Sequence, residues 1–401
     1  MIQYAYMVDT DIQKINALLE RGTEDIFIKE SLVKRLSSGK QLRIKLGIDP
    51  TSSFIHLGRA VTLRKLKAFQ DLGHQVVLII GDFTAKIGDP SDKLEKRPML
   101  TEEAIQENLK NYLDQIALIL DMSKVEVRYN SEWLASMNVL QIAQLLECFT
   151  VQQMSKRRNF KDRLDAGSDI FMVEFMYPAL QGYDSVEVRA DVELGGFDQL
   201  FNLKAGRIVQ KKYGQEEQDV MTLSMLEGTD GRKMSSSWGN IIGITDAPED
   251  MYGKVLSVKD ELLMQYFTLC TDLEMSEIAE IKKQLDAGEN PKHIKMRLAR
   301  EIVTLYHSKE KALEAEEAFE NTFSKGEIPE LVDIEVTEGT LLVEICLHHG
   351  LVSSKGEFTR LVESKSIEHM DSEKIVDDKN SIALTGTYRI GKKRFIKIKV
   401  R

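Results

Sequence analysis

The feature that most restricts the fold is a succession of strand, helix and strand patterns early in the chain. Residues Gln75–Ile80 contain an unbroken apolar run, which is typical of a strand buried on both faces of a parallel sheet. A helical pattern over Ala60–Leu72, closed by Gly73, precedes this run, and a short β-like segment, Leu42–Leu46, precedes the helix. This order predicts a βαβ unit, whose ligand is expected at the carboxyl ends of the strands.

The rest of the chain divides into regions of different pattern. Val125–Tyr129 repeats the strand pattern after a helix expected over Thr101–Leu120, and residues 141–210 are mostly helical in pattern. Met251–Thr322 is helical and heavily charged without a strand signal, which predicts a separate α-helical module. Lys325–Glu330 interrupts that pattern and is typical of a linker.

The C-terminal stretch again mixes helix and strand. Helical patterns cover Leu341–His348 and Lys355–Ser364, and strand patterns cover Tyr388–Ile390 and Arg394–Val400. Because 401 residues are too many for one ordinary domain, we expect two or three domains of the α/β class.

Composition limits the partners. The net charge of −10 argues against indiscriminate binding to nucleic acid, but basic residues gather locally at Lys156–Arg158 and between Arg389 and Arg401. The three cysteines are widely separated and lack a CxxC spacing, which favours neither a disulfide framework nor a zinc site. We find no signal-peptide pattern and no apolar run near the ~20 residues that span a bilayer. We therefore expect a cytoplasmic protein with no membrane partner.

The first of four polar segments joins the β-like segment to the following helix. It contains Gly47–Thr51 and then His56–Arg59. A helix N-terminus favours phosphate, and Gly58 has no Cβ to block a close approach. His56 and Arg59 are three residues apart and can face one ligand. The alternative is a surface loop that merely contains these two side chains.

The second segment, Gly81–Ser91, places Asp82 and Asp89 after the apolar strand. Carboxylates there can hold an ammonium group or a ribose, whereas the alternative is ordinary turn chemistry.

The third segment places a hydroxyl, an amide and a carboxylate on one helix face, since Tyr177, Gln181 and Asp184 are spaced i, i+4 and i+7. Buried polar groups cost roughly 1–3 kcal/mol each unless they are paired. A polar ligand would pair them, and an internal hydrogen-bond network is the alternative.

The fourth segment, Asp230–Asn240, sets Lys233 among small hydroxyl residues and glycines. This composition favours a mobile phosphate-binding loop, although no Walker A spacing precedes it. A solvated loop is the alternative.

In this order the four segments resemble the class I aminoacyl-tRNA synthetases. His56–Arg59 resembles their HIGH signature, and Lys233–Ser237 resembles KMSKS. The stretches KLGIDPTSSFIHLGR, YPALQGYDSVEVRADVELGGFDQLFNL and EGTDGRKMSSSWGN resemble bacterial tyrosyl-tRNA synthetases, and the C-terminal segment resembles their S4-type RNA-binding domain. The resemblance covers essentially the whole chain.

The resemblance implies a Rossmann-like catalytic domain with a parallel sheet, an α-helical domain and a small α+β S4-type RNA-binding domain. The implied boundaries are 1–245 for the catalytic domain and its dimer interface, 246–325 for the anticodon-side helices, 326–338 for a linker and 339–401 for the S4-like domain. It further implies a homodimer that converts L-tyrosine and ATP to tyrosyl-adenylate and pyrophosphate, and transfers tyrosine to tRNA(Tyr). Mg²⁺ is expected to accompany ATP, with no structural metal held by the protein.

The resemblance also assigns residues to each substrate. The catalytic, phosphate-handling positions are His56, Arg59, Lys233, Ser235 and Ser236. The tyrosine-binding positions are Asp89, Tyr177, Gln181, Asp184 and Gln199. The ATP-binding positions are Gly47, Asp49, Thr51, Gly58, Gly196, Asp198 and Lys233. The tRNA-binding positions are Lys355, Arg360, Arg389, Lys392, Lys393 and Arg394.

Within this scheme Asp184 accepts the tyrosine hydroxyl and Asp198 binds the ribose. The chemistry agrees with such a set, because a substrate carboxylate is already ionised at pH 7 and needs no protein nucleophile. The reaction needs positioning and stabilisation of charge on the phosphates.

Four positions depart from the family pattern. Arg59 replaces the second histidine of HIGH, Ser236 replaces the second lysine of KMSKS, and Phe197 replaces a small hydroxyl residue. Lys45 stands where some relatives carry a tyrosine that helps to bind the substrate hydroxyl. No function follows for Lys45 from the resemblance.

Two alternative functions remain. A paralogue would form the adenylate of a different amino acid or serve a different acceptor, as the departures at Arg59 and Phe197 suggest. A non-catalytic RNA-binding protein on a synthetase scaffold would have no need of the polar set around Asp184.

Overall fold

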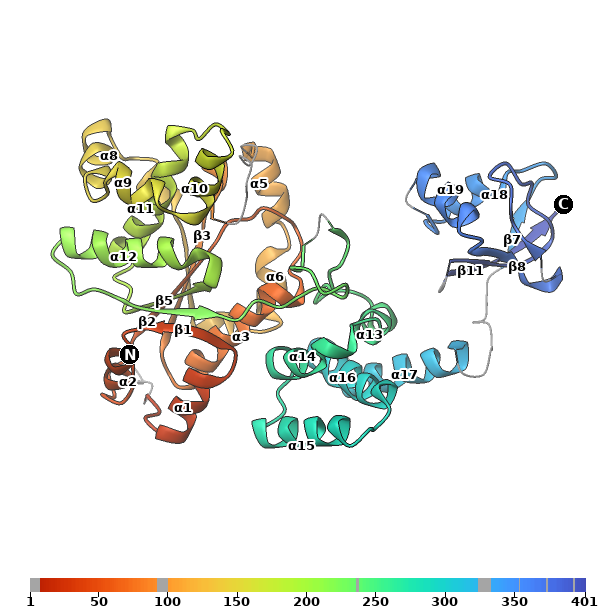
Figure 1. Cartoon of the computed structure of the whole chain (residues 1–401), viewed down its shortest axis with the longest axis horizontal. Coiled ribbons are helices and arrows are strands. Elements are labelled where there is room, and N and C mark those ends of the chain that lie inside the picture. The colour runs from red at the N-terminus through yellow and green to blue at the C-terminus, as the bar shows by residue number, and fades with distance from the viewer. Residues whose placement is uncertain are drawn as a thin grey trace. The chain divides into compact units, whose positions relative to one another are not determined.

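The computed structural model describes residues 8–91, 100–235, 238–323, 333–352, 354–372, 374–391 and 394–401. The chain forms two compact units, Met1–Leu313 and Glu314–Arg401 (Figure 1). The expected linker segment Lys325–Glu330 lies outside the described residues.

The first unit is built on a mixed sheet with strand order β1-β6-β5-β2-β3-β4. The strands are β1 (Thr23–Phe27), β2 (Arg43–Ile48), β3 (Gln75–Ile80), β4 (Val125–Tyr129), β5 (Val192–Gly196) and β6 (Asp219–Leu223). The pairs from β6 to β4 are parallel, and β1 joins β6 antiparallel. The predicted βαβ unit is therefore confirmed, with β2 and β3 as adjacent parallel strands. The apolar run of β3 is fully buried, as its composition requires.

Helices cover both faces of this sheet. They are α1 (Ile12–Glu20), α2 (Lys29–Leu36), α3 (Leu57–Asp71), α4 (Thr84–Ile87), α5 (Glu102–Leu109), α6 (Tyr112–Ala117), α7 (Ser131–Leu134), α8 (Val139–Leu146), α9 (Val151–Ser155), α10 (Arg158–Asp165), α11 (Met172–Glu187) and α12 (Leu200–Lys212). In Figure 1, α11 and α12 lie on one side of the sheet, and α1 and α3 lie on the other. Val77 and Ile79 of β3 pack with Leu180 of α11 and Val209 of α12 in one core cluster.

One predicted helix is wrong in its extent. The pattern over Thr101–Leu120 forms two helices, α5 and α6, rather than one. The backbone of Asn111 leaves the helical region, with φ −120° and ψ 15°, and separates them. Short polar side chains such as asparagine favour this kind of interruption because they compete for backbone hydrogen bonds.

A run of helices follows the sheet, and helix is the secondary structure that the sequence predicts there. They are α13 (Pro248–Leu256), α14 (Leu263–Cys270), α15 (Met275–Asp286), α16 (Pro291–Tyr306) and α17 (Lys309–Phe323). Arg21, at the end of α1, links the helices that follow the sheet to the part of the unit that contains the sheet. Its guanidinium donates to the carbonyls of Thr268 at 2.9 Å and Leu273 at 2.8 Å. This explains why the helices up to Leu313 form one compact unit with the sheet.

The second unit has a smaller sheet with strand order β7-β11-β10-β8-β9. Its strands are β7 (Asp333–Val336), β8 (Ile367–His369), β9 (Lys374–Ile375), β10 (Gly386–Ile390) and β11 (Arg394–Val400). Two helices, α18 (Leu342–His348) and α19 (Lys355–Glu363), pack on it through a core that contains Phe358 and Ile398. The predicted fold class, a parallel α/β sheet followed by helices and a small α+β region, is confirmed. In the described part of the chain no helix is long and apolar enough to cross a membrane.

Candidate active site

Polar residues of the first unit, some of them predicted from the sequence, gather at the carboxyl edge of the parallel strands. Asp49 follows β2, Thr84 follows β3, Asn130 follows β4 and Gln199 follows β5. The carboxyl edge of a parallel sheet is where such folds bind ligands, because the strand ends leave a crevice there.

Asp184 lies at the closed end of this crevice, with only 3% of the residue exposed. Its Oδ1 accepts from Trp133 Nε1 at 2.8 Å, and its Oδ2 accepts from Asn130 Nδ2 at 3.4 Å. Burial raises the pKa of Asp184 to about 7, and the effect is opposed by the charge of Lys45 and by these two donors. Sequence reasoning missed Asn130 and Trp133, although their position directly after a predicted strand was a usable signal.

A second chain of hydrogen bonds ties the end of β2 to α11. Tyr177 donates its hydroxyl to Asp49 Oδ2 at 2.9 Å, and Thr84 donates to Asp49 Oδ1 at 2.7 Å. Gly81 makes this possible, because a Cβ at that position would lie 2.0 Å from Asp49 Oδ1. Burial, together with the nearby Asp49, raises the pKa of Tyr177 well above its usual value, so its hydroxyl stays protonated and remains a donor.

Asp89 forms the third polar group, between α4 and α12. Its Oδ2 accepts from Gln199 Nε2 at 3.2 Å, and its Oδ1 accepts from Asn202 Nδ2 at 3.1 Å and from the Ser91 hydroxyl at 2.6 Å. The structure thus joins Asp89 to Gln199. Burial chiefly raises the pKa of the Tyr177 hydroxyl on α11, and Asp89 and Asp184 both lie near enough for their charges to raise it further.

Gln181 has a different environment from its neighbours on α11. Its Nε2 donates to Glu193 Oε1 of β5 at 3.0 Å. Of the two interpretations of the polar helix face, an internal network therefore accounts for the amide nitrogen of Gln181.

His56 is the N-cap residue of α3 and is buried. Burial, together with the charges of Arg59 and Lys233, lowers the pKa of His56 to about 4. The imidazole is therefore neutral at pH 7. Its Nδ1 has no hydrogen-bond partner among the described residues.

Arg59 is held by two hydrogen bonds. Its Nη2 donates to Thr51 Oγ1 at 2.8 Å, and its Nη1 donates to Tyr112 OH at 3.1 Å. Arg59 and Thr51, which the resemblance placed at the nucleotide, are thus in direct contact.

The start of α3 also contacts the 230–240 loop. The Gly58 amide points at Met234 Sδ, 3.3 Å away, and a Cβ at Gly58 would lie 3.1 Å from the His56 ring. Leu57 donates its backbone N–H to Ile242 O. The first two amides of α3 thus contact the loop region in this structure, and the glycine allows Met234 to pack there.

Lys233 Nζ lies 2.9 Å from Asp198 Oδ2, so the loop lysine and the expected ribose-binding carboxylate form an ion pair. Ser235 donates its backbone N–H to Asn240 Oδ1 at 2.9 Å, which orders the described part of the loop. Ser236 lies outside the described residues.

The remaining expected positions differ in what surrounds them. A Cβ built at Gly47 would meet no atom within 4 Å, so space lies open above the end of β2. A Cβ at Gly196 would lie 2.5 Å from Asp198 Oδ1. Phe197, which replaces a small hydroxyl residue of the family pattern, lies between Gly196 and Asp198 in the sequence. It is 51% exposed, so its ring is not part of the core.

In the second unit the expected tRNA-binding residues fall into two groups. Lys355 and Arg360 are exposed on α19. Arg389 pairs with Glu368, and Arg394 pairs with Glu357 at 2.8 Å. Lys392 and Lys393 lie outside the described residues.

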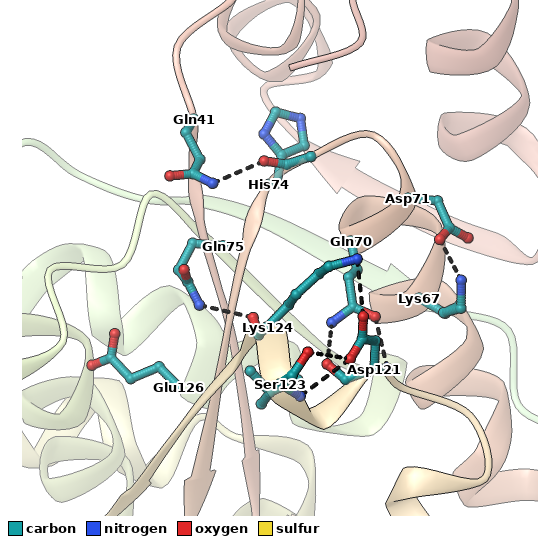
Figure 2. Close-up of a pocket in the computed structure, with 12 residues that line it drawn as sticks. Gln41, Lys67, Gln70, Asp71, His74, Gln75, Asp121, Ser123, Lys124 and Glu126 are labelled. Carbon is teal, nitrogen blue, oxygen red and sulfur yellow. Dashed lines mark hydrogen bonds and ion pairs between the residues drawn. The ribbon is translucent and has the colours of Figure 1, made fainter. Parts of the chain in front are cut away.

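A cavity of about 550 Å³ lies at the opposite edge of the first sheet, where β3 and β4 begin (Figure 2). Its polar side chains bond to one another or to nearby backbone: Gln70 Nε2 donates to Asp121 O at 3.0 Å, and Gln75 Nε2 donates to Lys124 O at 3.1 Å. Most of these groups satisfy each other, and the one buried lining atom without a partner among the described residues is His74 Nε2; we assign no ligand to this cavity. In the described part of the chain, no group of three or more histidine, cysteine, aspartate or glutamate residues is arranged to hold a metal ion.

Comparisons with known proteins agree with this geometry. A family model described as tRNA synthetases class I (W and Y) matches residues 37–324. The tyrosine–tRNA ligase of Thermotoga maritima is 46% identical over 386 residues, covering 95% of this chain and 96% of that protein. The enzyme of the same name from Desulfotalea psychrophila is 45% identical over 392 residues, with coverage of 95% and 96%.

Solved structures share the fold. The tyrosyl-tRNA synthetase of Archaeoglobus fulgidus, complexed with L-tyrosine, has a TM-score of 0.60 at 22% identity and covers 76% of this chain and 99% of its own. The C-terminally truncated mitochondrial tyrosyl-tRNA synthetase of Aspergillus nidulans has a TM-score of 0.65 at 20% identity, with coverage of 77% and 94%.

Proposed function

The chain belongs to the family of class I tRNA synthetases for tryptophan and tyrosine, and we propose that it is the ligase that joins L-tyrosine to tRNA(Tyr). The first step makes tyrosyl-adenylate and pyrophosphate from tyrosine and ATP, and the second transfers the tyrosyl group to the tRNA. The close relatives from Thermotoga maritima and Desulfotalea psychrophila, matched over nearly their whole length, support this assignment.

The observation that carries the choice of tyrosine is the buried carboxylate of Asp184. Trp133 and Asn130 already donate to it, so it offers its remaining lone pairs to one more donor, the substrate hydroxyl. Phenylalanine would leave that acceptor unpaired, and a tryptophan side chain has no hydroxyl to offer. Tyrosine-specific synthetases are the known example of this effect, and they reject phenylalanine by about 10⁵-fold.

The other end of the amino acid is assigned to the groups around Asp89. We propose that Asp89, Tyr177 and Gln181 hold the substrate ammonium, and that Gln199 lies beside the α-carbon. The hydrogen bond between Gln199 and Asp89 supports a common role, because it fixes both side chains at the same end of the crevice.

ATP is assigned to the strand ends and to the start of α3. We propose contacts with ATP at Gly47, Asp49, Thr51, Gly58, Gly196 and Asp198, with Asp198 on the ribose. His56, Arg59, Lys233, Ser235 and Ser236 would then stabilise the charge that builds on the phosphates during attack by the tyrosine carboxylate. His56 acts there as a neutral hydrogen-bonding group, because its lowered pKa leaves it uncharged at pH 7. Mg²⁺ is expected to arrive on the phosphates of ATP.

The transfer step requires that the tRNA be held. We propose that Lys355, Arg360, Arg389, Lys392, Lys393 and Arg394 contact its phosphates. This binding should weaken steeply with salt, because each neutralised phosphate releases counterions. We also place the enzyme in the cytoplasm, where its three free thiols are compatible with a reducing compartment.

An exposed apolar surface supports a homodimer. It is formed by large side chains of α8, α9, α10 and the start of α11, namely Val139, Leu140, Val151, Leu164, Phe171 and Met172. Apolar patches of this kind mark interaction sites, and we propose a second copy of the chain as the partner. Light scattering of the wild type, with Val139→Glu/Met172→Glu as the disrupted form, tests this assignment.

The function is tested by tyrosine-dependent ATP–pyrophosphate exchange, followed by charging of purified tRNA(Tyr). Exchange and charging with tyrosine, and neither with phenylalanine or tryptophan, is the expected result. Exchange without charging would favour the paralogue that serves another acceptor. Absence of both, in a folded protein, would favour a non-catalytic RNA-binding scaffold.

A further inference from the structure

Two charged residues lie inside the sheet where strands are otherwise apolar. Lys45 of β2 and Glu193 of β5 are register partners in the parallel pair, and both side chains are 0% exposed. Lys45 Nζ lies 2.8 Å from Glu193 Oε1. The reaction described above uses neither residue.

The ammonium of Lys45 is fully engaged with the helix that carries the substrate-facing residues. Besides Glu193, it donates to the backbone carbonyl of Gln181 at 2.9 Å and to Ser185 Oγ at 2.7 Å. Three acceptors match the three N–H groups of a lysine. Lys45 thus holds α11 at the turn that contains Asp184.

Glu193 fixes the orientation of the Gln181 side chain. A carboxylate only accepts, so the group of Gln181 that lies 3.0 Å from Glu193 Oε1 must be the NH₂. The carboxamide oxygen therefore points away from Glu193. It accepts no hydrogen bond from the described residues and is not among the fully enclosed polar atoms that lack a partner, so it is at least partly accessible.

We propose that Lys45 and Glu193 are a positioning pair for tyrosine, an inference that rests on the proposed function. Glu193 turns Gln181 so that its oxygen, rather than its NH₂ group, is offered to the substrate ammonium. Lys45 holds α11 in place, and its positive charge favours the ionised form of Asp184, the form that accepts the substrate hydroxyl. One buried ion pair thereby serves both ends of the amino acid.

Stability alone is a poor reason for such a pair. Charges buried in a core lose their hydration, and apolar replacements of similar shape are often as stable or more so. The choice of a lysine and a glutamate here is therefore better explained by what they do to Gln181 and Asp184.

The charge effect on Asp184 can be followed through pH. The charged and polar groups that face Asp184 are Lys45 from β2, Glu193 from β5, and Asn130 and Trp133 at the end of β4. Tyr177 lies on the same helix and is hydrogen-bonded to Asp49. Removing the positive charge of Lys45 leaves burial less opposed, so the pKa of Asp184 should rise further and tyrosine binding should need a higher pH.

The first test is the double variant Lys45→Met/Glu193→Gln, which removes both charges and leaves no unpaired ion. The amide oxygen introduced by Glu193→Gln can still accept from Gln181, so this variant removes the two charges and the hydrogen bonds of Lys45 to α11 while Gln181 keeps its acceptor. The charge of Lys45 outweighs the opposing charge of Glu193 at Asp184, so the pKa of Asp184 should still rise when both are removed. A rise of about one unit from about 7 would raise the KM for tyrosine at pH 7 about fivefold, with the pH profile displaced upward and the KM for ATP unchanged. The second, Lys45→Met/Glu193→Leu, also frees Gln181 and should raise the KM for tyrosine at every pH.

The control is Arg163→Met/Glu174→Gln, which neutralises another buried ion pair of the same unit, at the first turn of α11. Neither of these two described residues forms a hydrogen bond or ion pair with Asp184 or Gln181. It should leave the pH profile for tyrosine unchanged. An unchanged profile in a folded Lys45→Met/Glu193→Gln variant would overturn the proposal.

If neither double variant folds, Ser185→Ala decides the matter, because it removes one hydroxyl that contacts both Lys45 and Glu193. A KM for tyrosine raised about twofold, with that for ATP unchanged, is the expected result; no change would overturn the positioning role. Failure of the wild type itself to catalyse tyrosine-dependent exchange would instead overturn the proposed function.

Discussion

Two lysine–carboxylate pairs of similar geometry lie in the first unit, one beside the proposed tyrosine-binding residues and one among the proposed ATP-binding residues. Lys45 and Glu193 are 2.8 Å apart and fully buried, whereas Lys233 and Asp198 are 2.9 Å apart with side chains 41% and 26% exposed. The distance between the charged atoms therefore says little about how easily either ion pair opens. The local environment decides, since a buried pair cannot exchange its partners for water while an exposed pair is screened and weak.

The difference matches what each substrate needs. The tyrosine end must discriminate between side chains that differ by one hydroxyl, so its groups are fixed by internal hydrogen bonds before substrate arrives. In the proposed function the loop lysine leaves Asp198 for the phosphates of ATP while Asp198 takes the ribose. An ion pair that costs little to open is suited to that exchange.

The largest expected effect on activity is at Asp184, the residue proposed to accept the tyrosine hydroxyl. Asp184→Asn removes the charge that accepts the substrate hydroxyl, and we expect kcat/KM for tyrosine to fall about 10³-fold, about 4 kcal/mol. Activation of phenylalanine should change little, so the discrimination between the two collapses. Pyrophosphate exchange with both amino acids measures this ratio, and a preserved ratio would contradict the assignment of Asp184.

The next prediction compares the pairs directly through stability. Lys45→Met alone leaves Glu193 buried without its cation and should cost about 3–5 kcal/mol, which corresponds to a fall in Tm of about 5–8 °C for a unit of this size. Lys233→Met alone should change stability by less than about 0.5 kcal/mol, because the pair is exposed. Calorimetry of the two variants gives the comparison, and equal shifts would show that burial does not separate the pairs.

For catalysis we expect a large effect at the exposed lysine, Lys233, although its effect on stability should be small. Lys233→Ala should slow adenylate formation about 100-fold, about 2.7 kcal/mol, because charge on the leaving pyrophosphate loses a donor. Single-turnover kinetics measure the step, and the KM for tyrosine should stay the same. The matched control is Lys212→Ala, an exposed lysine that pairs with Glu147 outside the crevice. A loss under threefold would refute the role of Lys233.

The pH dependence of the closed end follows from Asp184. Its pKa is raised from 3.8 to about 7, chiefly by burial, so between these values the folded chain keeps a proton that the unfolded chain releases, and this group's contribution to stability falls as pH rises. Tyrosine binding has the opposite sign, because it needs the carboxylate. The KM for tyrosine should rise about tenfold per unit below pH 7, and a flat profile from pH 6 to 8 would contradict it. His56, with its pKa near 4, adds no titration in that range.

Much of the fold was readable from the sequence because periodicity reports burial directly. The runs of β3 and β4 have the predicted limits, since apolar residues in parallel strands leave few alternatives. The break between α5 and α6 was not predicted, because it depends on the backbone of Asn111 rather than on any apolar pattern.

The candidate site likewise contains residues that the sequence predicted and contacts that it did not. The face formed by Tyr177, Gln181 and Asp184 follows from spacing along one helix. The contacts of Asp184 with Trp133, and of Lys45 with Glu193, join residues far apart in the chain, and no local pattern contains them. A charged residue in an apolar strand was the available signal for Lys45 and Glu193, but it names no partner.

The smallest expected effect concerns Arg59, where the family pattern has histidine. Arg59 is fixed by Thr51 and Tyr112, and an arginine binds phosphate in the ground state more strongly than a neutral imidazole does. Arg59→His should therefore raise the KM for ATP and kcat together, by about threefold each, because ground-state binding is lost without loss of transition-state binding. Steady-state kinetics with varied ATP measure both constants. Tyr112→Phe, which removes only one tether, should give a smaller change in the same direction, and a variant at Arg59 with both constants unaltered would show that the arginine is a neutral replacement.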